Sequence, residues 1–249
     1  MKPARSEKKL KTPNSWSQLT HGLWVSESIQ TRLDEWCPQL FGYHLLKLGG
    51  LSCELGSSLC NIPHQVNLDI HNPLHHVIAD GFALPFLEKS FDTVILSHQL
   101  DYCNDPHRLL REVDRVMIDD GYLIITGFNP ISLIGISSLM PWRKHSLPWS
   151  GRMFTSNRIK DWLSVLNYEV IHCDRYALFP MQRNRTMWTW MENAIGDWAA
   201  PMGSLYFIVA RKRTYPLKLI KPHWKIKRRL APVGVNYRTG IRQSSSLPD

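Results

Sequence analysis

The chain has 249 residues, of which 43% are hydrophobic and 20% are charged, a balance typical of globular proteins and unlike that of disordered ones. The formal net charge of +9 is concentrated at the two ends. Residues 211–249 carry eleven Lys and Arg against one acid and residues 1–12 carry five against one, which leaves −5 for residues 13–210. The basic pI therefore does not indicate a nucleic-acid-binding protein; we expect at most a weak, salt-dependent attraction through the tail.

Cysteine spacing and apolar segments bear on the cellular compartment. The five cysteines form no C-x-x-C pair and no metal-ligand spacing, so we expect reduced thiols. No apolar segment follows the N-terminal lysines, as it would in a signal peptide. Residues 121–142 lack charge over nearly the length of a membrane span, but the sequence GFNP at 127–130 interrupts them. We expect a cytoplasmic protein without a stable membrane span.

Strands and helices are predicted to alternate between a flexible basic arm (residues 1–15) and a basic disordered tail (residues 214–249). A first helix is expected to begin near Ser26. A second has Asp105 as its N-cap and Pro106 in its first turn. A third is capped by Ser156, and a fourth covers about residues 187–198. Residues 131–155 form an apolar lid insertion. Strands are expected over residues 43–48, 64–70, 76–79, 91–97, 122–126, 169–173 and 204–210.

This alternation predicts one Rossmann-like α/β domain over residues 16–213, with a mostly parallel seven-stranded sheet and helices on both faces. In such sheets ligands bind beyond the carboxyl ends of the strands. The residues directly after the strands are therefore the candidate site: Gly49, Gly50, Asp69, Asp80, Gly81, Phe82, Ser97, His98 and residues 127–130.

Two neighbouring motifs carry a family resemblance. Residues 79–86 (ADGFALPF) and 90–94 (SFDTV) resemble the type 11 family of class I S-adenosylmethionine-dependent methyltransferases, whose members read roughly D-a-x-x-L-P-F…S-F-D-x-V. The sequences DPHRLLRE at 105–112 and GFNP at 127–130 are closer to an uncharacterised bacterial branch, the YafS-like proteins. The resemblance covers about residues 40–215 in outline and is specific over 79–130. It implies the class I methyltransferase fold, S-adenosylmethionine as the cofactor, and methyl transfer to an unidentified small-molecule acceptor.

The resemblance also implies roles for single residues. Asp80 would accept a hydrogen bond from the adenine amino group, with the backbone of Gly81 and Phe82 beside the ring; the alternative is an ordinary turn aspartate. Asp69 has the position of a ribose-binding acid, but only eleven positions separate it from Asp80, so that role stays open. Asp92 opens a strand, and we expect it to cap a turn.

The first family motif departs from its pattern of an acid and three glycines. Residues 47–53 read KLGGLSC, with Lys47 in place of the acid and with Leu51 and Cys53 at glycine positions. Glycines at these positions let the backbone approach the methionine part of the cofactor. Two interpretations therefore stay open: an active methyltransferase, and a non-catalytic relative that kept the fold for binding or regulation.

His98 is the best-placed candidate base, since an imidazole titrates near neutrality; the alternative is a histidine hydrogen-bonded at the end of the sheet. Trp142 and Trp149 either belong to the core or line an apolar acceptor site in the lid. The sequence indicates neither the acceptor nor the oligomeric state. Weaker candidates for the base are Asp101, Tyr102 and His107.

Overall fold

A computed structural model describes residue 10 and residues 12–70, 74–137, 147, 149–177 and 203–214. The predicted helix over about 187–198, Trp142 and the tail after Thr214 lie outside these residues, so those predictions stay open.

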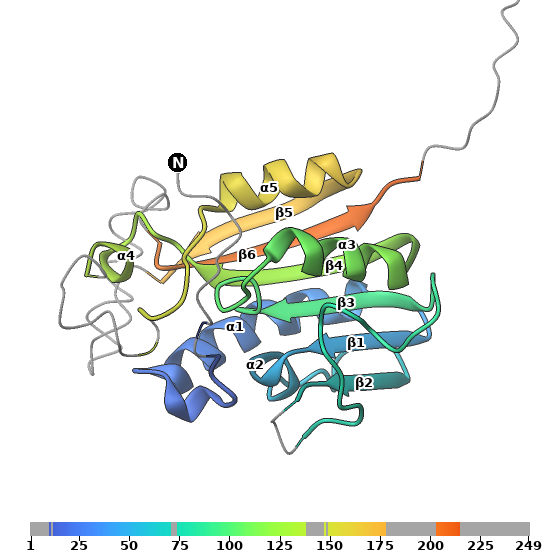
Figure 1. Cartoon of the computed structure of the whole chain (residues 1–249), viewed down its shortest axis with the longest axis horizontal. Coiled ribbons are helices and arrows are strands. Elements are labelled where there is room, and N and C mark those ends of the chain that lie inside the picture. The colour runs from blue at the N-terminus through green and yellow to red at the C-terminus, as the bar shows by residue number, and fades with distance from the viewer. Residues whose placement is uncertain are drawn as a thin grey trace, which may run out of the picture. The chain divides into compact units, whose positions relative to one another are not determined.

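The described residues form one six-stranded sheet in the order β2-β1-β3-β4-β6-β5 (Figure 1). Strands β1 to β4 are parallel to one another, and β6 is antiparallel to both β4 and β5. The predicted mostly parallel α/β sheet is confirmed. The strands are β1 (His44–Leu48), β2 (His64–Leu68), β3 (Phe91–Ser97), β4 (Met117–Phe128), β5 (Tyr168–Tyr176) and β6 (Leu205–Lys212).

The expected count of seven strands is wrong by one in the described part of the chain. The strand predicted over residues 76–79 forms only a single parallel bridge, between Leu68 and Val77. A parallel connection needs a crossover of a dozen or more residues, and fewer separate these two positions. The segment after β2 therefore pairs with the edge of the sheet at this one bridge and does not form a seventh strand.

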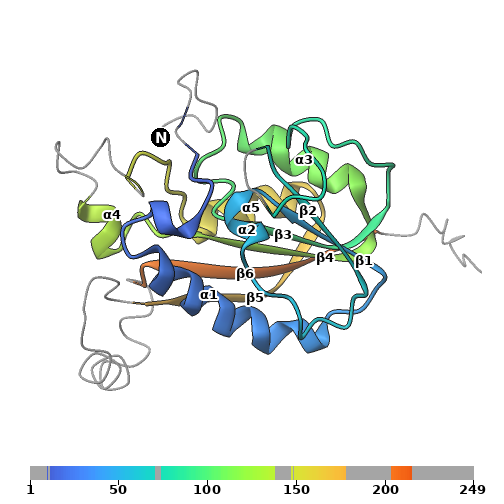
Figure 2. The same ribbon diagram turned by 90° about the horizontal axis from the view of Figure 1, so that it is seen from below.

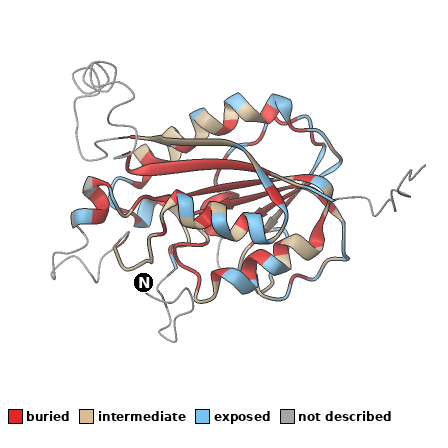
Figure 3. Ribbon diagram, turned by 90° about the horizontal axis from the view of Figure 1, so that it is seen from above, coloured by how far each residue is buried: buried red, intermediate tan, exposed pale blue. Residues whose placement is uncertain are grey.

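Helices cover both faces of the sheet, as predicted. Because side chains alternate along a strand, Leu45 and Ile95 face α1 (Gly22–Trp36) and α2 (Gly50–Cys53). Leu46 and Val94 point to the opposite face, toward α3 (Pro106–Val116) and α5 (Ser156–Val165). Figure 2 shows α1 and α3 on opposite sides of the sheet, and Figure 3 shows its central strands buried along most of their length. Shorter elements are η1 (Trp16–Gln18), η2 (Cys37–Gln39) and α4 (Leu133–Ser137).

Local capping explains where the helices begin. The Asp105 side chain accepts a hydrogen bond from the Arg108 amide at the start of α3, as predicted. Helix α5 is capped by Thr155 instead of Ser156. Helix α1 begins at Gly22 and not near Ser26, because a residue without a side chain can lie against the Trp16 carbonyl.

The uncharged stretch after Gly121 is divided between strand β4 and the short helix α4. No helix in the described ranges is long and apolar enough to cross a membrane.

Two of the five cysteines do not match the prediction of reduced thiols. Cys37 and Cys60 form a disulfide, while Cys53, Cys103 and Cys173 are free. The pairing joins residues 23 positions apart, which no short cysteine motif reveals.

Candidate functional site

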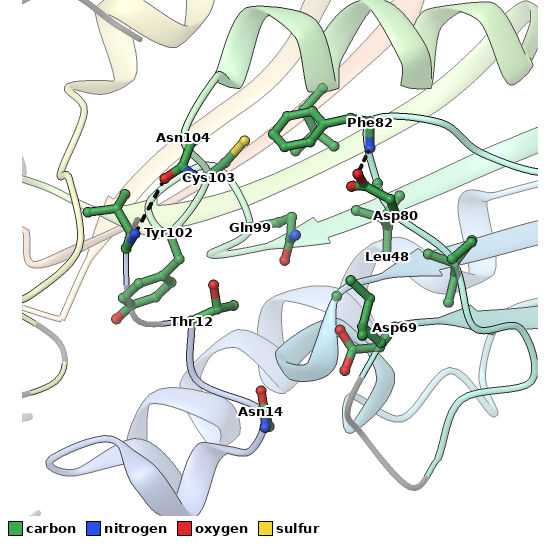
Figure 4. Close-up of a pocket in the computed structure, with 17 residues that line it drawn as sticks. Thr12, Asn14, Leu48, Asp69, Asp80, Phe82, Gln99, Tyr102, Cys103 and Asn104 are labelled. Atoms are coloured by element: carbon green, nitrogen blue, oxygen red, sulfur yellow. Dashed lines mark hydrogen bonds between the residues drawn. The ribbon is translucent and has the colours of Figure 1, made fainter. Parts of the chain in front are cut away.

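A cavity of about 430 Å³ opens at the carboxyl ends of β1, β2 and β3 (Figure 4). The chain reaches β2 on one side of β1 and then β3 on the other, and this reversal of strand order is where open α/β sheets bind ligands. The volume lies in the range of small-molecule sites.

Five of the predicted site residues line this cavity: Gly49, Asp69, Asp80, Gly81 and Phe82. Gly50, Ser97 and His98 do not, and neither do residues 127–130. Gly50 packs beneath the backbone of Asn14. Ser97 is buried in the sheet, where its amide donates to Ser52 Oγ and its hydroxyl lies 3.0 Å from Thr126 Oγ1.

His98 also lies outside the cavity lining. It is fully buried with φ of +52°, and Gln99, the next residue, lines the cavity in its place. The His98 ring lies between Trp16 and Phe128, with ring centroids 5.6 and 4.1 Å away.

A buried hydrogen bond joins His98 Nδ1 to Asp101 Oδ2 at 2.9 Å. The same carboxylate oxygen accepts from the Phe128 amide at 3.1 Å. Burial raises the pKa of the Asp101 carboxyl, and the hydrogen bond from His98 opposes that rise. Among the described residues His98 Nε2 has no partner. Asp101 thus orients the His98 ring through Nδ1, while the second ring nitrogen, Nε2, has no hydrogen-bond partner in the described residues.

The other candidate bases differ in position. Tyr102 lines the cavity, and burial raises the pKa of its hydroxyl well above the usual value. His107 lies on α3 with its ring 4.4 Å from that of Trp162, outside the cavity lining.

Asp80 is both a turn residue and a cavity residue. Its Oδ1 accepts a hydrogen bond from the Phe82 amide at 3.0 Å, which closes a tight side-chain turn. The side chain is exposed and lines the cavity, so a second carboxylate oxygen faces the region where a ligand would bind. The two interpretations of Asp80 are therefore compatible.

The loop after Asp80 is held to α3 by hydrogen bonds from and to two residues that form an ion pair within that helix, Glu112 and Arg115. Arg115 donates to the carbonyls of Leu84 and Phe86 at 3.0 Å each and to Glu112 at 2.7 Å. Glu112 Oε1 in turn accepts from the Leu84 amide at 2.9 Å. The hydrogen bond from Arg115 lowers the pKa of Glu112. The segment that directly follows Asp80 and Phe82 is thus anchored to α3 at Leu84 and Phe86.

We expect Arg115→Met to loosen this loop while the sheet stays intact. The substitution keeps the aliphatic packing of the side chain but removes its hydrogen bonds, each worth about 1 kcal/mol. Hydrogen exchange measured by mass spectrometry should show residues 80–87 exchanging about tenfold faster or more, with β3 unchanged. Arg111→Met, on an exposed position of the same helix, is the control. Equal hydrogen-exchange rates of residues 80–87 in the two variants would contradict the role of Arg115 in holding this loop.

The residues that replace the family's glycines do not line the cavity. Leu51 and Cys53 are buried in α2. Gly49 has φ of +91°, and a side chain there would overlap that of Gln99. Lys47 Nζ is turned away, donating to the Leu55 carbonyl at 2.6 Å, and burial lowers its pKa.

The sequence prediction missed the part of the N-terminal arm that forms a wall of the cavity. Leu10, Thr12 and Asn14 line it, a role in the site that the sequence prediction did not give to the arm. Pro13 and Trp16 are buried. Pro13 in the arm and Trp16 directly after it were the apolar signal that could have found this wall.

The motif at residues 127–130 spans the last two residues of β4, Gly127 and Phe128, and the start of the turn after it. Asn129 Nδ2 donates to the Gly203 carbonyl at 2.8 Å and its Oδ1 accepts from the Ile131 amide at 3.2 Å. Nearby, Trp149 is half-buried, and its indole N–H donates to the Ile134 carbonyl and to Ser137 Oγ at 3.1 and 2.8 Å.

Comparison with known proteins connects this geometry to a family. Residues 60–125 match the model of a methyltransferase domain. The uncharacterized protein YafS of Escherichia coli is 42% identical over 219 residues, which are 88% of this chain and 89% of YafS. A demethylmenaquinone methyltransferase of Thermobifida fusca is 34% identical over 82 residues, covering 32% of this chain and 35% of that protein.

Solved structures agree on the fold. A SAM-dependent methyltransferase from Archaeoglobus fulgidus superposes with a TM-score of 0.53 at 21% identity, over 75% of this chain and 94% of that one. The six-stranded sheet is thus that of the class I methyltransferases, and the family implies S-adenosylmethionine as the cofactor. The chain belongs to the family of YafS, within the methyltransferase type 11 proteins.

Proposed function

We propose that this protein transfers the methyl group of S-adenosylmethionine to a small-molecule acceptor of apolar character. The observation that carries the proposal is the cavity at the reversal of strand order, with the carboxylates of Asp69 and Asp80 both in its lining. The partial match to a demethylmenaquinone methyltransferase supports methyl transfer as the activity.

The lining residues fit an adenosine-containing ligand. Asp80 is suited to accept from the adenine amino group and Asp69 from ribose hydroxyls, while Phe82 and Leu109 supply apolar surface to the base. In the described part of the lining the only charged side chains are these two acids, which favours a ligand rich in donors.

Bound S-adenosylmethionine supplies a methyl group on a sulfonium, so the protein mainly has to align the acceptor and, for some acceptors, remove a proton. His98, the candidate base, is fully buried outside the cavity lining, so we propose instead that its hydrogen bond to Asp101 positions the end of β3, from which Gln99 lines the cavity. The apolar character of the acceptor is proposed from the aromatic residues of segment 131–155, of which Trp149 and Phe154 are described and lie outside the cavity lining.

The direct test is calorimetric titration with S-adenosylhomocysteine, the demethylated form of the cofactor. We expect a Kd in the micromolar range or tighter, about −8 kcal/mol, and a rise in Tm with ligand concentration. Absence of both heat and thermal shift at millimolar ligand would contradict the proposal. It would favour the alternative, a non-catalytic binding protein. That alternative is based on the departures from the first family motif at Lys47, Leu51 and Cys53.

A further inference from the structure

Three polar side chains line the cavity from two separate segments of the chain. Thr12 and Asn14 line it from the N-terminal strap, which we define as residues 12–15, and Gln99 lines it from the end of β3 (Figure 4). In the part of the chain that the structure describes, the side chains of Thr12 and Gln99 form no hydrogen bond. Their donors and acceptors are therefore available to a ligand.

The strap is fixed to the domain on both sides of these residues. After it, the Trp16 indole N–H donates to the Leu51 carbonyl and the Trp16 amide to Glu54 Oε2, both at 3.0 Å. Before it, the Leu10 amide lies 3.4 Å from Asn104 Oδ1. Trp16 itself is only 2% exposed. A buried aromatic anchor and hydrogen bonds at both ends make the strap a built wall of the cavity.

The two remaining glycines of the first motif have specific partners in this wall. A Cβ atom on Gly50 would lie 2.6 Å from the Asn14 carbonyl oxygen, so only glycine lets the strap backbone come this close. A Cβ atom on Gly49 would overlap Gln99. Gly50 thus leaves room for the strap backbone, and Gly49 leaves room for the Gln99 side chain.

We propose that Thr12, Asn14 and Gln99 bind the amino-acid end of S-adenosylmethionine. This inference rests on the proposed function, under which the adenine end lies at Asp80 and the amino-acid end at the opposite end of the cavity. That end carries an ammonium and a carboxylate, and one hydroxyl and two amides can accept from the ammonium and donate to the carboxylate. The acid of the family motif is replaced by Lys47, whose amine donates to Leu55 instead, so another group has to serve the ammonium.

Calorimetry with two ligands tests this assignment. S-adenosylhomocysteine has the amino-acid end, and 5′-methylthioadenosine has the same adenosine without it. In the full-length chain, Thr12→Val combined with Asn14→Ala should weaken S-adenosylhomocysteine binding about tenfold or more, since hydrogen bonds to charged groups are lost. Binding of 5′-methylthioadenosine should change less than about threefold. Gln99→Ala, on the other wall, should reproduce this selective loss.

Ser17→Ala is the control, because Ser17 is exposed in η1 and outside the cavity lining; both affinities should stay at the wild-type value. Equal weakening of both ligands in the Thr12 and Asn14 variant, or no weakening of S-adenosylhomocysteine, would overturn the assignment while leaving the proposed function intact. If the wild-type protein binds neither ligand, the proposed function fails and this inference fails with it.

Discussion

Asp101→Ala should lower the free energy of unfolding by about 3–5 kcal/mol. Asp101 and His98 are 1% and 0% exposed, and the carboxylate accepts from both His98 Nδ1 and the Phe128 amide. Removing it leaves two buried groups without an acceptor in a site that the packed rings of Trp16 and Phe128 close to water. Denaturant unfolding measures the loss, and Tm should fall on the order of 10 °C.

Asp101→Asn is the matched control, because its amide oxygen can still accept from both donors. We expect a loss of only about 1–2 kcal/mol. Since burial holds the pKa of Asp101 above its usual range, ionisation costs more in the folded state than in the unfolded state. The advantage of the wild type over Asp101→Asn should therefore shrink as the pH rises above about 4. Equal losses for Ala and Asn would show that the hydrogen bonds do not carry the effect.

The fold was predictable where local signals agree with the packing. Strand β3 and helix α3 have the predicted bounds or nearly so, because a run of β-branched residues and an Asp-Pro cap act within a few residues of where they occur. The strand expected over 76–79 failed for a non-local reason: its pairing depends on a crossover that the short connection cannot supply.

The site was predictable only where it follows directly from strand ends. Asp69 lies near the end of the strand predicted over 64–70, Asp80 directly follows the one predicted over 76–79, and both line the cavity. His98 was placed by the same logic, yet a single residue with positive φ turns the chain so that Gln99 faces the cavity. Contacts between distant segments, such as Asn14 on Gly50, leave no periodic pattern in the sequence. Such contacts complete the cavity wall, and sequence spacing does not show them.

The role of Asp80 can be separated from its role in the turn with two substitutions. We expect Asp80→Ala to weaken S-adenosylhomocysteine binding by about 1–3 kcal/mol, roughly 5- to 150-fold. Asp80→Asn keeps an oxygen to accept from the Phe82 amide, as Oδ1 now does at 3.0 Å, but replaces the second oxygen with a donor. If Asp80 accepts from the adenine amino group, the Asn variant should lose about as much affinity as the Ala variant.

Asp92 provides the matched control, since it is an aspartate at the opposite end of the sheet. Its Oδ2 accepts from the amides of Tyr43 and His44 at 2.8 Å each, which agrees with the structural role expected from the sequence. Asp92→Ala should lower the free energy of unfolding by about 1–3 kcal/mol while leaving S-adenosylhomocysteine affinity unchanged in calorimetry below Tm. An Asp80→Asn variant with wild-type affinity would limit Asp80 to the turn, and unchanged affinity in a folded Asp80→Ala variant would remove it from the site.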